Sequence, residues 1–101
     1  MIKVIIKRNE NIIKSIELSG HAKYDIYGKD IVCAGVSSML TYMVNACLMF
    51  DSESIKYEEG KVFKLFNLKE DNTTNTLLEN FYNLIKELST DYKDNIKIEE
   101  E

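Results

Sequence analysis

The chain opens with two short segments in which apolar and polar residues partly alternate. Residues 2–8 are rich in β-branched side chains, and residues 11–19 hold a second apolar set. A period of two residues predicts β-strands, because alternate side chains of a strand point to opposite faces. The short Asn9-Glu10 segment between them predicts a turn, so the first nineteen residues are typical of a hairpin.

The hydrophobic period then changes from two residues to three or four. Residues 20–32 hold two of the four glycines and predict a loop. From Cys33 to Phe50 the apolar positions recur at helical spacing, which predicts an amphipathic helix with one buried stripe. That stripe consists of Val36, Leu40, Met43, Cys47 and Phe50.

The second half of the chain repeats this order. Residues 54–58 and 61–68 predict a second hairpin around Glu59-Gly60, and residues 95–99 predict a short edge strand. Residues 72–92 predict a second helix, whose N-cap we expect at one of its first three residues. Those three residues are Asn72, Thr73 and Thr74, and the expected apolar face holds Leu77, Phe81, Leu84, Ile85 and Leu88.

Two hairpins, each followed by a helix, define the expected fold class. We predict a two-layer α+β fold of order ββαββ(α), with an antiparallel sheet packed against two helices. The 101 residues suffice for one domain, here taken as residues 1–101. A core of this size gives modest stability, which a partner subunit would increase.

Charge and targeting patterns limit the classes of partner and the location that we expect for the protein. The net charge of −4 argues against direct nucleic-acid binding, which calls for a basic patch. The apolar run after Met1 is short and interrupted by charge, unlike a signal peptide, and we expect no window that resembles a membrane span. The sequence therefore predicts a cytoplasmic protein without a membrane partner.

The two cysteines are too far apart to pair with each other. Cys33 and Cys47 are separated by fourteen positions in one predicted helix, a distance of roughly 20 Å at a rise of about 1.5 Å per residue. A disulfide needs Cα atoms within about 7 Å, so we expect two free thiols. Cys47 lies on the apolar stripe and is typical of a small core residue.

Cys33 and His21, the only histidine, form the candidate chemistry. A thiol in the first turn of a helix gains from the helix dipole, which favours the thiolate. We expect free backbone N–H groups at the helix start, from Cys33, Ala34 or their neighbours, to stabilise an oxyanion, and a histidine folded back onto the thiol to activate it. The alternative remains that both residues have ordinary structural roles.

The residues around this pair have open roles. Asp30 would cap the helix, orient His21 or bind a substrate amine. Ser37 lies one turn after Cys33, where its hydroxyl would steady the thiolate or a substrate carbonyl, or bond to the helix backbone. The loop residues Tyr24, Ile26 and Tyr27 would line a peptide pocket as a lid hinged at Gly28, or anchor the loop on the core.

No cofactor or metal pattern is present in the sequence. One histidine and two distant cysteines lack the paired spacing of a zinc site, and there is no phosphate loop or dinucleotide fingerprint. We therefore expect catalysis without a cofactor and predict no metal ligands.

The region around His21 and Cys33 resembles a known signature. It is similar to that of the ribosomal-processing cysteine protease family, known as Prp. The resemblance also covers Val44-Asn45-Ala46 and, near the end of the chain, Tyr92 with Asn95-Ile96. The matching signature positions are Gly20-His21-Ala22, Gly28 and Asp30-Ile31-Val32-Cys33-Ala34-Gly35-Val36-Ser37.

The resemblance implies a specific activity. Family members remove a short N-terminal extension from large-subunit ribosomal protein number twenty-seven, and they are homodimers of an α+β fold. The family's nucleophile falls on Cys33 and its base on His21. Supporting or substrate-binding positions fall on Gly20, Gly28, Asp30, Ala34 and Ser37.

Two rival hypotheses stay open beside this one. A non-catalytic binding protein for ribosome assembly would bind the ribosomal protein precursor without cleaving it. A redox sensor would use Cys33 without His21. A test of whether the precursor is cleaved, and of whether cleavage depends on His21 and Cys33, separates the three hypotheses.

Overall fold

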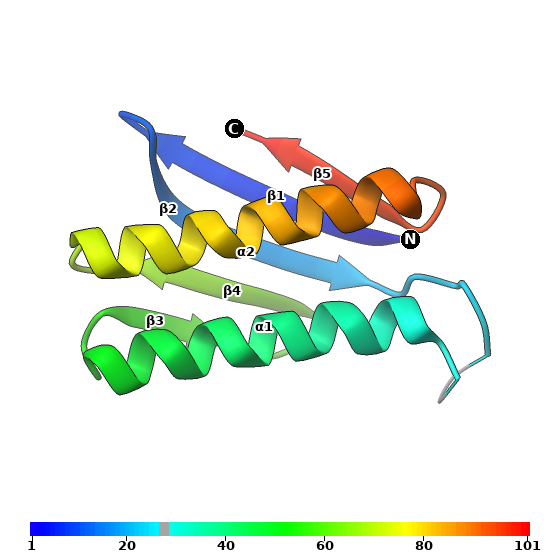
Figure 1. Cartoon of the computed structure of the whole chain (residues 1–101), viewed down its shortest axis with the longest axis horizontal. Coiled ribbons are helices and arrows are strands. Elements are labelled where there is room, and N and C mark those ends of the chain that lie inside the picture. Colours follow the sequence, from blue (N-terminus) through cyan, green and yellow to red (C-terminus); the bar gives the residue numbers. More distant parts are fainter. Residues whose placement is uncertain (27–28) are drawn as a thin grey trace.

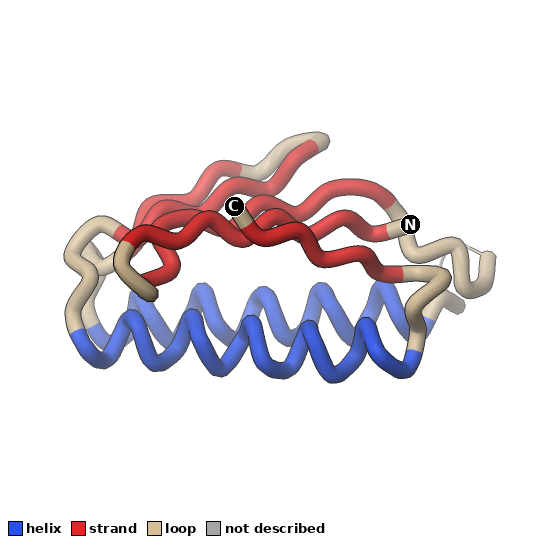
Figure 2. The backbone as a smooth tube through the Cα atoms, turned by 90° about the horizontal axis from the view of Figure 1, so that it is seen from above, coloured by secondary structure: helices blue, strands red, loops and turns tan. Residues whose placement is uncertain are grey.

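The computed structural model describes residues 1–26 and 29–101 and has two layers. A five-stranded sheet of order β3-β4-β2-β1-β5 forms one layer, and two helices cover one of its faces (Figures 1 and 2). The elements are β1 (Ile2–Asn9), β2 (Ile12–Gly20), α1 (Ile31–Phe50), β3 (Ile55–Glu58), β4 (Val62–Asn67), α2 (Asn72–Asp91) and β5 (Ile96–Glu100). The predicted α+β class and both hairpins are confirmed.

The sheet is mixed, whereas the sequence led us to expect an antiparallel one. The β1–β2, β2–β4 and β3–β4 pairs are antiparallel, but β5 runs parallel to β1, with Ile2 opposite Ile96. The path of α2 explains the difference. This helix brings the chain back to the end of the sheet where β1 starts, so β5 enters beside β1 in the same direction (Figure 1).

The core lies between the sheet and the helices. Along β1, Ile2, Val4 and Ile6 are buried at every second position, as the pleat of a strand requires. The helix layer closes over them. It contributes the buried apolar residues Val32, Val36, Met43, Val44 and Cys47 from α1 and Leu78, Phe81, Tyr82 and Ile85 from α2.

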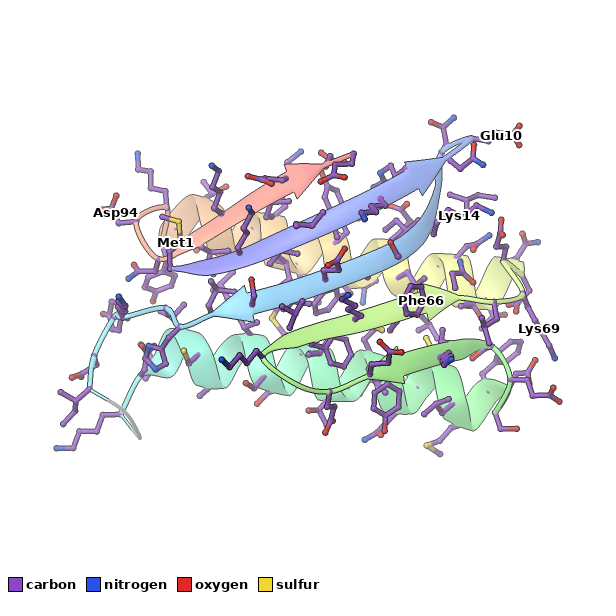
Figure 3. The ribbon with its side chains drawn as sticks, turned by 180° about the vertical axis from the view of Figure 1, so that it is seen from behind. Met1, Glu10, Lys14, Phe66, Lys69 and Asp94 are labelled. Atoms are coloured by element: carbon purple, nitrogen blue, oxygen red, sulfur yellow. The ribbon has the colours of Figure 1, made fainter. Side chains whose placement is uncertain are left out.

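Some of the expected helix stripe lies outside the core. Phe50 and Leu84 are exposed, and Leu40 is half-buried. Each helix rests on the sheet along a narrow strip, so apolar residues at the ends or on the flank of the predicted stripe remain at the surface. The opposite face of the sheet is open and carries the outward side chains of the strands (Figure 3).

Both helices begin with an aspartate cap. Helix α1 starts at Ile31, two residues before the predicted start, because Asp30 accepts hydrogen bonds from the N–H groups of Val32 and Cys33. Helix α2 is capped by Asp71, which accepts from the N–H of Thr74 at 2.9 Å. The cap expected at residues 72–74 therefore lies one position too late.

Helix α1 is more hydrophobic than expected for a helix with a single buried stripe. Its 20 residues include an 18-residue window of mean hydropathy 1.6, so by length and composition alone it is able to cross a membrane. The expectation that no window resembles a membrane span was wrong. One such helix is weak evidence for a membrane span. In this structure 28% of the window is buried, and Val32, Val36 and Cys47 lie in the core beneath the sheet.

Candidate active site

The candidate residues meet at one end of the molecule. This end holds the start of β1, the end of β2, the start of α1, the end of α2 and the start of β5 (Figure 1). Figure 3 shows Met1 and Asp94 lying close together there, although they are far apart in sequence. The loop that carries His21 leaves β2 at this end and leads into α1.

Gly20 ends β2 in a conformation that excludes other residues. Its φ is +85°, and a Cβ built on it would lie 2.2 Å from the backbone oxygen of Met1. Both observations require glycine, because a side chain would be strained and would collide with a neighbouring strand. Gly20 therefore supports the site by directing the chain out of the sheet toward His21.

Asp30 fixes both the loop and the helix. Its Oδ1 accepts from the N–H groups of Val32 at 3.0 Å and Cys33 at 2.9 Å. Its Oδ2 accepts from the N–H of Tyr24 at 2.9 Å and, at 3.4 Å, from that of Asp25. Of the roles considered for Asp30, helix capping is confirmed, and the same carboxylate also holds the loop.

The charge of Asp30 is stabilised by these contacts. Burial of the carboxylate raises its pKa, but the N–H groups of Cys33, Tyr24, Asp25 and Val32 together lower the pKa below its ordinary value. Asp30 is therefore anionic at neutral pH. Its Oδ2 lies 3.8 Å from Nδ1 of His21, so the charge of Asp30 faces the imidazole.

Cys33 is the third residue of α1 and is half-buried. Its Sγ accepts the backbone N–H of Ala22 at 3.3 Å, so a donor from the loop is directed at the sulfur. This bond ties the sulfur of α1 to the loop that carries His21. The structure thus provides Cys33 with a donor that sequence reasoning missed.

The expected oxyanion donors are already engaged. The Cys33 N–H donates to Asp30 Oδ1, and the Ala34 N–H donates to the backbone oxygen of Asp30 at 3.0 Å. The expectation that the N–H groups of Cys33 and Ala34 are free was wrong in this structure. Its physical reason is the strong cap, which uses the first N–H groups of the helix.

His21 lies beside this cap. Its Nδ1 accepts the N–H of Lys23 at 3.0 Å, and Lys23 has a left-handed backbone with φ of 56° that turns its N–H back toward the ring. Since Nδ1 accepts, the neutral ring carries its proton on Nε2. A ring nitrogen of His21, the Cys33 sulfur and an Asp30 carboxylate oxygen all lie within 4.8 Å of one another.

A cavity of about 200 Å³ lies beside the thiol. Apolar side chains of Leu18, Val36 and Leu40 line it, together with the polar Ser37 and Lys61. Ser37 is exposed and shares this cavity with Gly20 and Cys33, and Ala34 is also exposed. Lys61, from the turn between β3 and β4, was not a candidate, since a lone lysine in a turn carries no signal.

Only part of the predicted lid lies within the described residues. Tyr24 packs edge-on against Tyr92 with ring centroids 5.3 Å apart, so it anchors the loop on the turn between α2 and β5. Ile26 is exposed. The proposed lid residue Tyr27 and hinge Gly28 lie outside the described residues.

The same three side chains also satisfy the distance requirement for binding a metal. His21, Asp30 and Cys33 are ligand types found in zinc sites, and the prediction of no metal ligands considered only adjacent motifs along the sequence. The Asp30 carboxylate already accepts four N–H bonds, however. Nδ1 of His21 and the Cys33 sulfur each accept an N–H bond as well, so the cluster meets only the distance requirement.

Comparison with known proteins gives a consistent result. The family model described as cysteine protease Prp matches residues 1–97. The ribosomal processing cysteine protease Prp of Bacillus subtilis strain 168 is 31% identical, with 97% of this chain and 96% of that protein covered. The protein of the same name from Staphylococcus aureus strain Mu50 is 32% identical, with 97% of each chain covered.

Solved structures agree with these relatives. A crystal structure of the essential ribosomal processing protease Prp from S. aureus, with a covalently linked product peptide, has a TM-score of 0.94 and 28% identity over the whole of both chains. The same protease in complex with a substrate peptide gives a TM-score of 0.87 and 27% identity, again over the whole of both chains.

Proposed function

The chain belongs to the cysteine protease Prp family, and from this premise we propose that it is an endopeptidase of ribosome maturation that removes the N-terminal extension of large-subunit ribosomal protein number twenty-seven. We assign the nucleophile to Cys33 and the general base to His21. The observation that carries this assignment is the cluster of the His21 ring nitrogen, the Cys33 sulfur and the Asp30 carboxylate within 4.8 Å.

In the proposed reaction, a ring nitrogen of His21 takes the proton of the Cys33 thiol. The thiolate then attacks the scissile carbonyl, forming a C–S bond and an oxyanion. His21 gives its proton to the leaving amine as the C–N bond breaks, which leaves a thioester on Cys33. Water hydrolyses this thioester while His21 accepts a proton from the water, and the thiol is restored.

Asp30 contributes to this cycle through charge. His21 becomes positive when it takes the proton, and the anionic Oδ2 of Asp30 lies 3.8 Å from its Nδ1. An opposite charge at this distance stabilises the imidazolium. Because Asp30 is held by four backbone N–H groups, it stays in place while the charge on His21 changes.

The cavity beside Cys33 is the proposed binding site for the peptide. Its Leu18, Val36 and Leu40 side chains suit an apolar side chain of the substrate, and Ser37 lies within reach of its polar backbone. The S. aureus relative has been solved with a substrate peptide and with a covalently linked product peptide. These complexes support a peptide substrate for this chain as well.

We further propose a cytoplasmic homodimer. The helix layer carries exposed apolar side chains, including Tyr42 and Leu84, around a groove of about 290 Å³ between α1 and α2. Burying such side chains against a second copy would remove apolar surface from water. Light scattering after size-exclusion chromatography should give twice the 11.7 kDa chain mass.

The direct test uses the extended ribosomal precursor and intact-mass analysis. Wild-type protein should produce one shortened species, whereas Cys33→Ala and His21→Ala should leave the precursor intact while keeping the fold by circular dichroism. Cys47→Ala is the matched control, because it removes the other thiol and should keep cleavage. Binding of the precursor without any product, by wild-type protein, would favour the non-catalytic assembly protein instead.

A further inference from the structure

Asn95 connects the far end of the chain to the candidate active site. It precedes β5 in the turn after α2, and its side-chain amide donates to the backbone oxygen of Ala22 at 2.9 Å. The two residues are 73 positions apart. A contact this long in sequence requires both segments to reach the same end of the sheet, where Figure 3 places Met1 and Asp94.

The backbone of Asn95 is itself fixed. Its N–H donates to the oxygen of Tyr92 at 2.9 Å, and its own oxygen accepts the N–H of Ile2 at 2.8 Å. Ile2 is paired with Gly20 at the end of β2. Asn95 therefore projects its amide from a rigid position, held by the same sheet end from which the His21 loop leaves.

Ala22 is held at both of its backbone polar groups. Its oxygen accepts from Asn95, and its N–H donates to Cys33 Sγ at 3.3 Å. Ala22 is also buried and lies outside any strand, so a buried backbone oxygen in this segment needs a donor from elsewhere. The Asn95 amide supplies that donor and thereby restricts the direction of the Ala22 N–H.

We propose that Asn95 is a positioning residue for the nucleophile, which holds Ala22 so that its N–H stays directed at the Cys33 sulfur. The proposal deepens the proposed function, since it uses Cys33 as the reactive thiol. Asn95 does not touch the reacting atoms; it acts through Ala22. The same turn makes a second contact with the loop, the Tyr92–Tyr24 ring pair. This contact holds the loop at Tyr24 and not at Ala22.

The consequence is measurable without the ribosomal substrate. Loss of a well-directed N–H donor to a thiolate weakens the anion by roughly the strength of one hydrogen bond to a charged group, about a tenfold change in equilibrium. The fraction of reactive thiolate near neutral pH should fall accordingly. The pH profile of thiol alkylation should therefore move to higher pH.

The test measures the rate of iodoacetamide alkylation of Cys33 from pH 5 to 10 by intact mass, in a Cys47→Ala background. Asn95→Asp nearly keeps the side-chain shape but replaces the donor with an acceptor facing the Ala22 oxygen. We expect its alkylation to be about tenfold slower at pH 7 and its profile to move upward. Asp94→Ala alters an exposed residue of the same turn and should match wild type.

A purely structural role predicts a different result. Asn95→Asp would then have a lower melting temperature but an unchanged alkylation profile, which would overturn the proposal. Asn95→Ala, which removes the donor without adding a charge, serves if Asn95→Asp does not fold, and its alkylation at pH 7 should also be slower than that of the wild type. The precursor assay separates the two proposals. If Asn95→Asp has a shifted profile but the wild-type protein cleaves no precursor, only the proposed function is refuted.

Discussion

The backbone N–H of Cys33 donates to Oδ1 of Asp30 at 2.9 Å, so the residue that caps α1 is bonded directly to the backbone of the candidate nucleophile. The other carboxylate oxygen of Asp30 holds the loop through the N–H of Tyr24. One buried charge thus fixes where α1 begins and where the His21 loop lies. It also means that the N–H of Cys33 is already engaged by the cap in this structure.

The charge of Asp30 should make stability depend on pH. Its pKa is lowered in the folded protein, so its contribution is present above the ordinary carboxyl pKa of about 3.9 and is lost as pH falls through the lower folded value. We expect Asp30→Asn to melt about 5–10 °C below wild type between pH 5 and 8. The difference should shrink below about pH 4, measured by thermal circular dichroism.

The substitution also separates the two functions of the carboxylate. Asn keeps one oxygen for the helix cap but places an amide donor against the N–H groups of Tyr24 and Asp25. Precursor cleavage should therefore fall even at a temperature where the variant is fully folded. A melting difference that stays constant down to pH 2 would contradict the charged role of Asp30.

The two thiols should differ sharply in reactivity. Burial raises the pKa of Cys47 to about 11, and the nearby Asp71 adds to this shift. Cys47 is also enclosed in the core, whereas Cys33 is half-buried beside a cavity. We expect iodoacetamide at pH 7.5 to label Cys33 alone in the native protein, with Cys47 labelled only after denaturation.

Peptide mapping by mass spectrometry checks this prediction. The two sites lie fourteen positions apart and are distinguished by fragmentation of the labelled peptides. Labelling of Cys47 at a rate similar to that of Cys33 in the folded state would mean that the core around α1 opens readily.

The sequence predicted the elements well because their patterns are local. Alternation along residues 2–8 and helical spacing after Cys33 arise from burial on one face, and the structure confirms both. The predicted start of α1 lies two residues too late, because the sequence pattern at Ile31 and Val32 is compatible with the end of a loop as well as with a helix. The parallel pairing of β5 with β1 depends on where α2 delivers the chain, which no local pattern encodes.

The site was predicted by residue type more than by geometry. The signature brought His21, Asp30 and Cys33 together, and the structure agrees that they are neighbours. The Asn95–Ala22 bond spans 73 positions, and the donor to the Cys33 sulfur is a backbone group of Ala22. Neither contact can be predicted from the spacing of residue types along the sequence. The cap that consumes the Cys33 and Ala34 N–H groups likewise appears only when the Asp30 side chain is placed.

Gly20 should tolerate no side chain. Gly20→Ala would force an L-residue into a φ of +85° and place its Cβ 2.2 Å from the Met1 backbone oxygen, so the backbone would have to shift. We expect a loss of stability of more than about 1 kcal/mol and a strong loss of cleavage. Gly35→Ala is the matched control for stability.

Gly35 differs from Gly20 in both respects. It lies inside α1, its φ is not in the left-handed region, and a Cβ there would meet nothing within 4 Å. Alanine is the better helix former by about 1 kcal/mol, so Gly35→Ala should raise the melting temperature slightly. A Gly20→Ala variant as stable as the wild type would contradict the close approach of Gly20 to Met1.

Chelation should leave cleavage unchanged, and added zinc should inhibit it. The proposed reaction uses the Cys33 thiolate and the His21 imidazole directly, and an ion held by these two groups would block both. Asp30 would complete such a site only by giving up N–H bonds of the helix cap or the loop. We therefore expect full precursor cleavage after dialysis against EDTA and inhibition by micromolar Zn²⁺ that EDTA reverses. Loss of activity on chelation, restored by one metal and not by others, would instead make the cluster a working metal site and reassign His21 and Cys33 as its ligands.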